Sequence, residues 1–142
     1  MNVIGFNRVE LIVSDGDIEK AAKQFNEVLG TNLPTPIAIE GHPVLSSTDF
    51  DGGIELVAPI DNAGTMGARH AQKGPGQIGP LVWEISDIDE ARTWLTEKGY
   101  RIFFEYDSTA GNEDEAHMAV RQLVLDPAQW FGFSVTLMQR VG

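Results

Sequence analysis

The sequence predicts an α+β fold made of two tandem βαβββ modules. Three observations predict it. The order strand, helix, three strands occurs twice in 142 residues. The second copy follows the first by about 72 residues, as shown by matching Val13-Ser14-Asp15 with Ile85-Ser86-Asp87. One helix is too little to cover the sheet of its own module, so we expect both modules to share one mixed sheet, curved around a cavity with the helices outside.

The first module begins with a strand in which Val9, Leu11 and Val13 alternate with more polar residues. Residues 14–17 supply candidate N-cap side chains for the helix that follows. A stripe of apolar residues indicates the helix, which ends before Gly30. The stripe consists of Ile18, Ala21, Ala22, Phe25, Val28 and Leu29. Three short strands are expected near 37–40, 44–48 and 54–57, with turns between them.

The second module repeats this order. Leu81, Trp83 and Ile85 alternate along a strand, and Asp87 with Glu90 has the spacing of a capping box for the next helix. Three more strands are expected near 101–105, 118–125 and 133–138, with an acidic turn over 109–115. We expect a single domain over 1–142, with module one at about 3–58, a linker with about one helical turn at about 59–79, and module two at about 80–139.

Composition excludes several classes of function. Ten Lys and Arg against 21 Asp and Glu give a net charge of −11, which disfavours nucleic acid and anionic membranes as partners. The absence of cysteine excludes disulfides, thiolate metal sites and cysteine nucleophiles. No signal peptide or membrane span is recognisable, so we expect a cytoplasmic protein.

Four segments together resemble the vicinal oxygen chelate superfamily, which includes glyoxalase I, bleomycin-resistance proteins, extradiol dioxygenases and methylmalonyl-CoA epimerase. They are VELIVSDGDIEKAAKQFNEVLG, GGIELVAP, KGPGQIGPLVWEISDIDEARTWLTEKGY and LDPAQWFGFSVTLMQ. The KGPG segment and the DP…GFSVTLMQ ending are most similar to the epimerase branch. The resemblance implies a divalent metal in the cavity, held by His, Glu, His and Glu from the first, fourth, fifth and eighth strands.

This chain departs from that ligand set. Glu55 matches the fourth-strand glutamate, but Pro80 and Thr136 stand at the fifth- and eighth-strand positions. The first-strand histidine position falls on Arg8, or on Glu10 if the alignment is anchored two residues later. Arg8 is preferred because this register turns Val9, Leu11 and Val13 toward the helix, and in both registers Arg8 and Glu10 share one face. Proline and arginine are not metal ligands and threonine is a weak one, so we predict no metal and no other cofactor.

An arginine in the cavity can replace the metal as a stabiliser of an oxyanion. The carboxylates and imidazole that could then move protons are Glu10, Glu55, Glu84, Glu40 and His42. Two other interpretations stay open: Arg8 and Glu55 can simply neutralise each other where the metal is lost, and Glu40 with His42 can be ordinary turn residues.

The last strand supplies candidate substrate contacts. They are Thr136, Ser134, Trp130 and Phe131, of which the two aromatic residues are expected at the cavity rim or at a dimer contact. His117 with Glu113 and Glu115 has the composition of a metal cluster, but its spacing favours a solvated acidic hairpin.

These observations favour a metal-independent isomerase, epimerase or lyase that acts next to a carbonyl group of a small organic substrate. The alternative is a non-catalytic, drug-sequestering protein of the bleomycin-resistance type, which the acidic charge and the missing ligands also fit. A third interpretation is an inert structural or regulatory dimer with a collapsed cavity. A homodimer is expected in each case, because such modules leave apolar edges that one chain does not cover.

Overall fold

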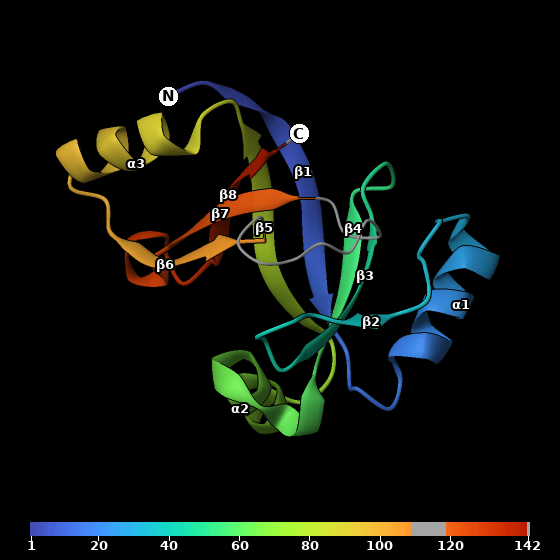
Figure 1. Cartoon of the computed structure of the whole chain (residues 1–142). Coiled ribbons are helices and arrows are strands. Elements are labelled where there is room, and N and C mark those ends of the chain that lie inside the picture. Colours follow the sequence, from blue (N-terminus) through green and yellow to red (C-terminus); the bar gives the residue numbers. More distant parts are fainter. Residues whose placement is uncertain (109–118, 142) are drawn as a thin grey trace. The chain divides into compact units, whose positions relative to one another are not determined.

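The computed structural model describes residues 1–108 and 119–141. The elements are β1 (Val3–Ile12), α1 (Ile18–Leu29), β2 (Ile37–Ala38), β3 (Val44–Asp49), β4 (Ile54–Pro59), η1 (Ile60–Asn62), α2 (Gly64–Lys73), β5 (Gln77–Ile85), α3 (Ile88–Glu97), β6 (Ile102–Asp107), β7 (Val120–Leu125), η2 (Pro127–Gln129) and β8 (Val135–Arg140). Strand, helix and three strands occur twice, so the predicted α+β fold of two βαβββ modules is confirmed (Figure 1).

The chain divides into two compact units. One comprises residues 8–79, and the other comprises residues 1–7 together with the chain from residue 80 onward. One boundary falls inside β1 and the other inside β5, so each of these two strands contributes residues to both units.

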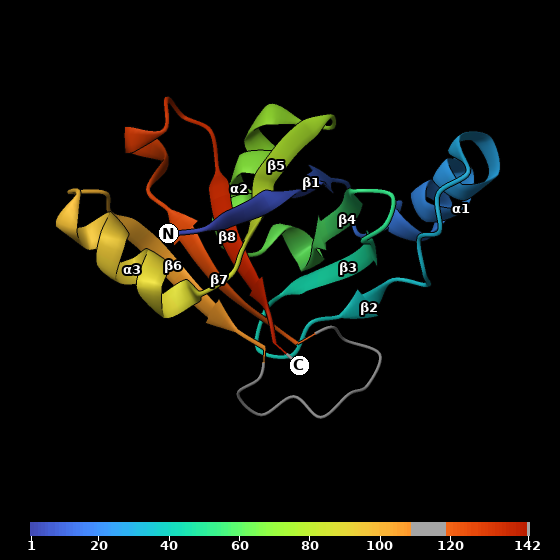
Figure 2. The ribbon, with the colours of Figure 1, turned by 90° about the horizontal axis from the view of Figure 1, so that it is seen from above.

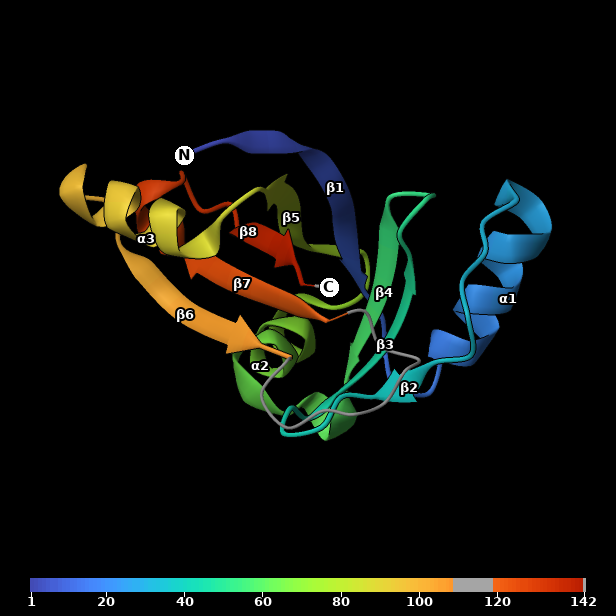
Figure 3. The same cartoon turned by 45° about the horizontal axis from the view of Figure 1, so that its top comes forward.

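In the unit of residues 8–79 the strand order is β2-β3-β4-β1. β1 is parallel to β4, while β3 is antiparallel to β4 and runs beside it (Figure 3). One face of these strands packs on α1, whose buried Ile18 and Ala22 contact Leu56 and Ala58 of β4 with Leu11 and Val13 at their side. Leu11 and Val13 therefore face the helix, as predicted, and the residues between them face the other side of the sheet.

The segment 59–79 is more regular than the sequence predicted, because α2 has ten residues instead of about one turn. Its buried positions are Gly67 and His70, which give no apolar helical stripe to recognise. A Cβ at Gly67 would overlap the backbone of Asn62, so glycine permits a close approach of the helix to the preceding turn. His70 Nε2 lies 3.5 Å from Ser14 Oγ and joins the helix to the chain after β1.

In the other unit the strands that follow residue 80 have the order β5-β8-β7-β6. α3 lies along one face of these strands (Figure 2) and buries its apolar stripe there. The core residues are Ile85, Ile88, Ala91, Leu95, Leu123, Leu125, Val135 and Leu137. The start of β1 lies beside β5, where the carbonyl of Asn2 accepts a hydrogen bond from the backbone N–H of Ser86.

The N-terminus of α3 is capped as predicted. Asp87 Oδ1 accepts hydrogen bonds from the backbone N–H groups of Asp89 and Glu90. Within the described residues, no hydrogen bond from the backbone N–H of Asp87 to the Glu90 carboxylate completes the capping box. This carboxylate pairs with the N-terminal ammonium of Met1 at 3.0 Å.

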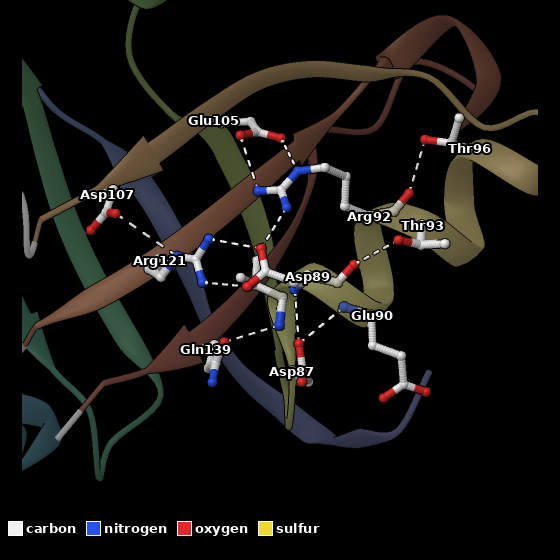
Figure 4. Close-up of polar contacts among 11 residues, drawn as sticks. Asp87, Asp89, Glu90, Arg92, Thr93, Thr96, Glu105, Asp107, Arg121 and Gln139 are labelled. Carbon is white, nitrogen blue, oxygen red and sulfur yellow. Dashed lines mark hydrogen bonds and ion pairs between the residues drawn. The ribbon is translucent and has the colours of Figure 1, made fainter.

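An exposed network of ion pairs joins α3 to β6 and β7 (Figure 4). Asp89 accepts from Arg92 at 2.6 Å and from Arg121 at 3.0 Å. Arg92 also donates to both oxygens of Glu105, at 2.6 and 3.1 Å. The two guanidinium groups hold the pKa of Asp89 well below its usual range. This network ties the helix to the sheet surface in water.

Candidate active site

A buried charged cluster lies on the face of the strands opposite α1 in the unit of residues 8–79. Arg8 and Glu10 are two residues apart on β1 and so share one face, and the parallel register places Glu10 directly beside Glu55 of β4. Arg8 is 4% exposed, and Glu10 and Glu55 are each 8% exposed, so all three ionisable residues are buried. Alternation along β1 and one strand pairing thus bring together three of the predicted site residues.

The contacts in this cluster are unequal. Arg8 Nε donates to Glu55 Oε1 at 2.7 Å, which is a short, charge-assisted hydrogen bond. Arg8 Nη2 is 3.7 Å from Glu10 Oε2, which is beyond hydrogen-bond distance. The second oxygen of Glu55 accepts from the hydroxyl of Ser46 on β3 at 3.0 Å. Glu55 is therefore bound at both oxygens.

The guanidinium of Arg8 also lies over the ring of Phe50, with its central carbon 5.3 Å from the ring centroid. A cation at that distance from an aromatic ring is attracted by the π-electrons. Phe50 and Glu55 together restrict the orientation of the guanidinium plane.

The pKa of Glu10 is raised from 4.5 to about 8, chiefly by burial and then by the negative charge of Glu55. The Arg8 guanidinium offsets part of this rise. At neutral pH Glu10 therefore holds a proton for most of the time. A buried carboxylic acid beside a buried arginine is an arrangement that enzymes use for acid–base chemistry.

The residues at the metal positions of the resembling family do not fit a divalent cation. Of Arg8, Glu55, Pro80 and Thr136, only Glu55 is an anionic ligand, and its two oxygens are bound to Arg8 and Ser46. Within residues 1–108 and 119–141, no group of three or more His, Cys, Asp or Glu side chains is placed to hold a metal. The Arg8 guanidinium places a positive charge 2.7 Å from Glu55 Oε1.

Glu84, another predicted proton carrier, belongs to the other unit. Its carboxylate pairs with Arg140 at 3.2 Å and accepts from the amide of Asn7 at 3.5 Å. Glu40 is exposed and His42 half-buried in the turn between β2 and β3, where the backbone N–H of His42 donates to the carbonyl of Ile39.

The predicted substrate contacts on and before β8 differ in exposure. Thr136 is 1% exposed and its hydroxyl has no hydrogen-bond partner in the described part of the chain. Trp130 packs against the core of its unit, whereas Phe131 is 92% exposed and has a positive φ of 59°. Ser134 is half-buried at the start of the strand. The predicted acidic hairpin with Glu113, Glu115 and His117 lies outside the described residues.

Two residues of the cluster were not predicted, Ser46 and Phe50. Ser46 and Thr48 alternate along β3 on the same face as Glu55, and their hydroxyl oxygens are 3.4 Å apart. Small hydroxyl residues at inward-facing positions of a strand are the signal in the sequence that could have indicated Ser46. Phe50 follows the strand in a turn, where sequence periodicity says nothing about its direction.

Comparison with known proteins places the chain in a family. The model of the Glyoxalase/Bleomycin resistance protein/Dioxygenase superfamily matches residues 7–118. The chain belongs to this superfamily. The predicted resemblance is thereby confirmed. None of the curated proteins is a significant match in sequence.

Solved structures of superfamily members share the fold at low identity. Methylmalonyl-CoA epimerase from Mycobacterium tuberculosis is 22% identical over 99% of this chain and 90% of that chain, with a TM-score of 0.76. A variant of the Streptomyces coelicolor epimerase in complex with 2-nitronate-propionyl-CoA is 17% identical over 99% of this chain and all of that chain (100%), with a TM-score of 0.77. Another methylmalonyl-CoA epimerase is 18% identical over 100% of this chain and 99% of that chain, with a TM-score of 0.79. These identities show a common fold.

Proposed function

We propose that this superfamily member is a metal-independent isomerase, epimerase or lyase that acts next to a carbonyl group of a small organic substrate. The observation that carries the proposal is the buried cluster in which Arg8 lies between two carboxyl groups. The cluster supplies positive charge without a metal, and it supplies a carboxyl group whose pKa lies near the working pH.

In the proposed mechanism, Arg8 stabilises the negative charge that develops on the substrate oxygen when a proton leaves the neighbouring carbon. A guanidinium is always charged and offers several donors in a fixed plane, so it can serve this role in a site that excludes water. Glu55 and Phe50 hold the guanidinium in place. A carboxyl group of the cluster exchanges a proton with the substrate.

The other predicted residues have narrower roles in this proposal. Glu40 or His42 acts as the base that takes the carbon-bound proton, while Glu84 is engaged by Arg140 and is a weaker candidate. Thr136, Ser134, Trp130 and Phe131, all in the other unit, stay candidates for substrate contacts. Thr136 is the best polar candidate among them, because its buried hydroxyl has no hydrogen-bond partner among the described residues and would gain one from a ligand.

The proposal is tested by hydrogen–deuterium exchange at the carbon next to a carbonyl. A panel of 2-substituted acyl compounds, thioesters included, is incubated with the protein in D₂O and followed by proton NMR. Thioesters belong in the panel because a related epimerase binds methylmalonyl-CoA, although a net charge of −11 opposes a polyanionic carrier. We expect enzyme-dependent exchange that Arg8→Met abolishes.

The matched control is Arg101→Met, which removes an arginine whose side chain is 62% exposed in a pair with Asp126. This variant should keep full exchange activity. Exchange that survives Arg8→Met would contradict the proposal. Binding without exchange across the panel would favour the non-catalytic, drug-sequestering alternative.

We also propose a homodimer. Phe131 and Phe133, two residues apart, are 92% and 63% exposed, and exposed aromatic side chains are frequent at subunit contacts. Light scattering should give twice the chain mass of 15.5 kDa at micromolar concentration, and the monomer mass would contradict the proposal.

No helix in the described residues is long and apolar enough to cross a membrane. The cytoplasmic location stays a prediction.

A further inference from the structure

The cluster contains the carboxyl groups of Glu10 and Glu55. Their surroundings differ at Ser46, a residue that no sequence motif indicated. Glu10 and Glu55 are paired neighbours in the parallel ladder between β1 and β4, so they are close enough to repel each other when both are ionised. Arg8, the buried arginine found beside them in the described part of the chain, neutralises one of them. The other must then keep a proton or bear an uncompensated charge out of water.

We propose that Ser46 is a positioning residue that decides which carboxyl group of the cluster carries the proton. Its hydroxyl donates to Glu55 Oε2 at 3.0 Å, which leaves Glu55 as the ionised partner of Arg8 and Glu10 as the proton donor to the substrate. This inference rests on the proposed function for the chemical step. The proton distribution itself can be measured without any substrate.

The hydrogen-bond geometry supports the assignment. Glu55 receives one donor at each oxygen, from Arg8 Nε at 2.7 Å and from Ser46 at 3.0 Å, and a carboxylate that accepts several hydrogen bonds is stabilised in its charged form. The contact found for the Glu10 carboxyl group in the described residues is Arg8 Nη2 at 3.7 Å. Hydrogen bonds therefore stabilise the ionised form of Glu10 less than the ionised form of Glu55.

The neighbouring strand strengthens the asymmetry. Thr48 stands directly opposite Glu55 on β3, and its hydroxyl is 3.4 Å from that of Ser46. This pair of hydroxyl groups lies on the Glu55 side of the cluster. Among residues 1–108 and 119–141, the charged groups found to act on Glu10 are Arg8 on its own strand and Glu55 on β4. The raised pKa of Glu10 agrees with the direction that the contacts predict.

The step assigned to Glu10 is a balanced proton transfer. The base takes the proton of the carbon next to the carbonyl group, and the electron pair of that C–H bond forms a C=C bond. The carbonyl π-pair moves to the oxygen. The O–H bond of Glu10 then breaks as a new O–H bond forms on that oxygen, and Glu10 remains as a carboxylate beside Arg8. The reverse transfer restores the acid.

The test is a pH titration of the full chain with carbon-13 in the glutamate carboxyl groups, followed by NMR. In the wild type we expect one carboxyl signal with a midpoint near pH 8, and it should disappear in Glu10→Gln. In Ser46→Ala part of this titration should shift from the Glu10 signal to the Glu55 signal, because Glu55 loses a donor and competes better for the proton. Ser46→Thr, which keeps a hydroxyl, should return the titration to Glu10.

Ser47→Ala is the matched control. Ser47 is the next residue on β3, is also buried, and donates to the carbonyl of Pro34 at 2.6 Å on the other face of the strand. Its loss should destabilise the fold and leave the midpoint near pH 8 unchanged. If Ser46→Ala does not fold, Ser46→Cys provides a weaker donor of similar size and should give a smaller shift in the same direction.

Three results would overturn the inference. They are a high midpoint that persists in Glu10→Gln and disappears in Glu55→Gln, a titration that stays wholly on Glu10 in both Ser46→Ala and Ser46→Cys, and an equal shift in Ser47→Ala. Each of them can occur whether or not the protein is an enzyme. Conversely, absence of hydrogen–deuterium exchange would reject the proposed function and leave the proton assignment standing.

Discussion

Two charged regions of this molecule use the same kinds of side chains with opposite consequences. In the buried cluster, Arg8 lies between Glu10 and Glu55, and burial drives the pKa of Glu10 up to about 8. In the exposed network of Figure 4, Asp89 lies between Arg92 and Arg121, and its pKa is held below its usual range. Asp89 also accepts from two arginines, although these pair with Glu105 and Asp107 as well, whereas the described contacts of Glu10 and Glu55 share Arg8.

Solvation decides what an ion pair does in these two regions. In water, an ion pair replaces favourable hydration with a similar attraction, so the network around Asp89 adds little stability and needs no other function. Away from water, each charge is costly unless it is paired, and an excess carboxyl group keeps its proton. A proton held in this way is available for chemistry.

The largest expected effect is that of Arg8→Met. It leaves the carboxyl groups of Glu10 and Glu55 buried without a cation, and breaking a buried pair in this manner costs about 3–5 kcal/mol of unfolding free energy. Glu55→Leu added to Arg8→Met should recover much of that loss. Chemical denaturation of the single and double variants measures both. A stability unchanged or raised in Arg8→Met would show that Arg8 is kept for a ligand and contributes nothing to the fold.

The second effect is a pH dependence of stability. The pKa of Glu10 is about 8 in the folded chain against 4.5 as the usual value, so between these pH values the folded state binds a proton that the unfolded state has lost. Stability from this group is therefore complete below about pH 4.5 and falls as pH rises toward 8, by at most about 1.4 kcal/mol per pH unit. Glu10→Gln should remove this component. Identical pH–stability curves for both proteins would contradict it.

A smaller effect is expected from Arg121→Gln in the exposed network. The side chain of Arg121 is 29% exposed and that of Asp89 is 64% exposed, so solvent and salt screen their attraction. The melting temperature should drop much less than in Arg8→Met. About 1 M salt should narrow the difference in melting temperature between Arg121→Gln and the wild type. It should not narrow the difference in melting temperature between Arg8→Met and the wild type. A large, salt-insensitive loss would mean that the network is structurally as important as the buried cluster.

The smallest expected effect is that of metal removal. Because Arg8 supplies the positive charge next to Glu55, the purified protein should hold no stoichiometric divalent metal, and EDTA should change neither its melting temperature nor any activity. Elemental analysis and paired melts with and without EDTA measure this. About one zinc, nickel or cobalt ion per chain would refute the metal-independent mechanism.

Much of the fold could be predicted from the sequence, because period-2 and helical patterns are local. The alternation of Val9, Leu11 and Val13 already places Arg8 and Glu10 on the opposite face of the strand. Asp87 already indicates the start of α3, because an N-cap depends on residues within one turn. The helix α2 was missed because it packs through Gly67 and His70, which leave no apolar period.

The composition of the candidate site was decided by tertiary structure. Sequence reasoning could not tell that Glu10 stands beside Glu55, since the register between β1 and β4 depends on packing across residues far apart in the chain. It could not place the Ser46 hydroxyl on Glu55, or assign Glu84 to Arg140. Which side chains exist on a face follows from local periodicity. Which of them meet, and which carboxyl group keeps a proton, depends on distances and burial that only the folded chain creates.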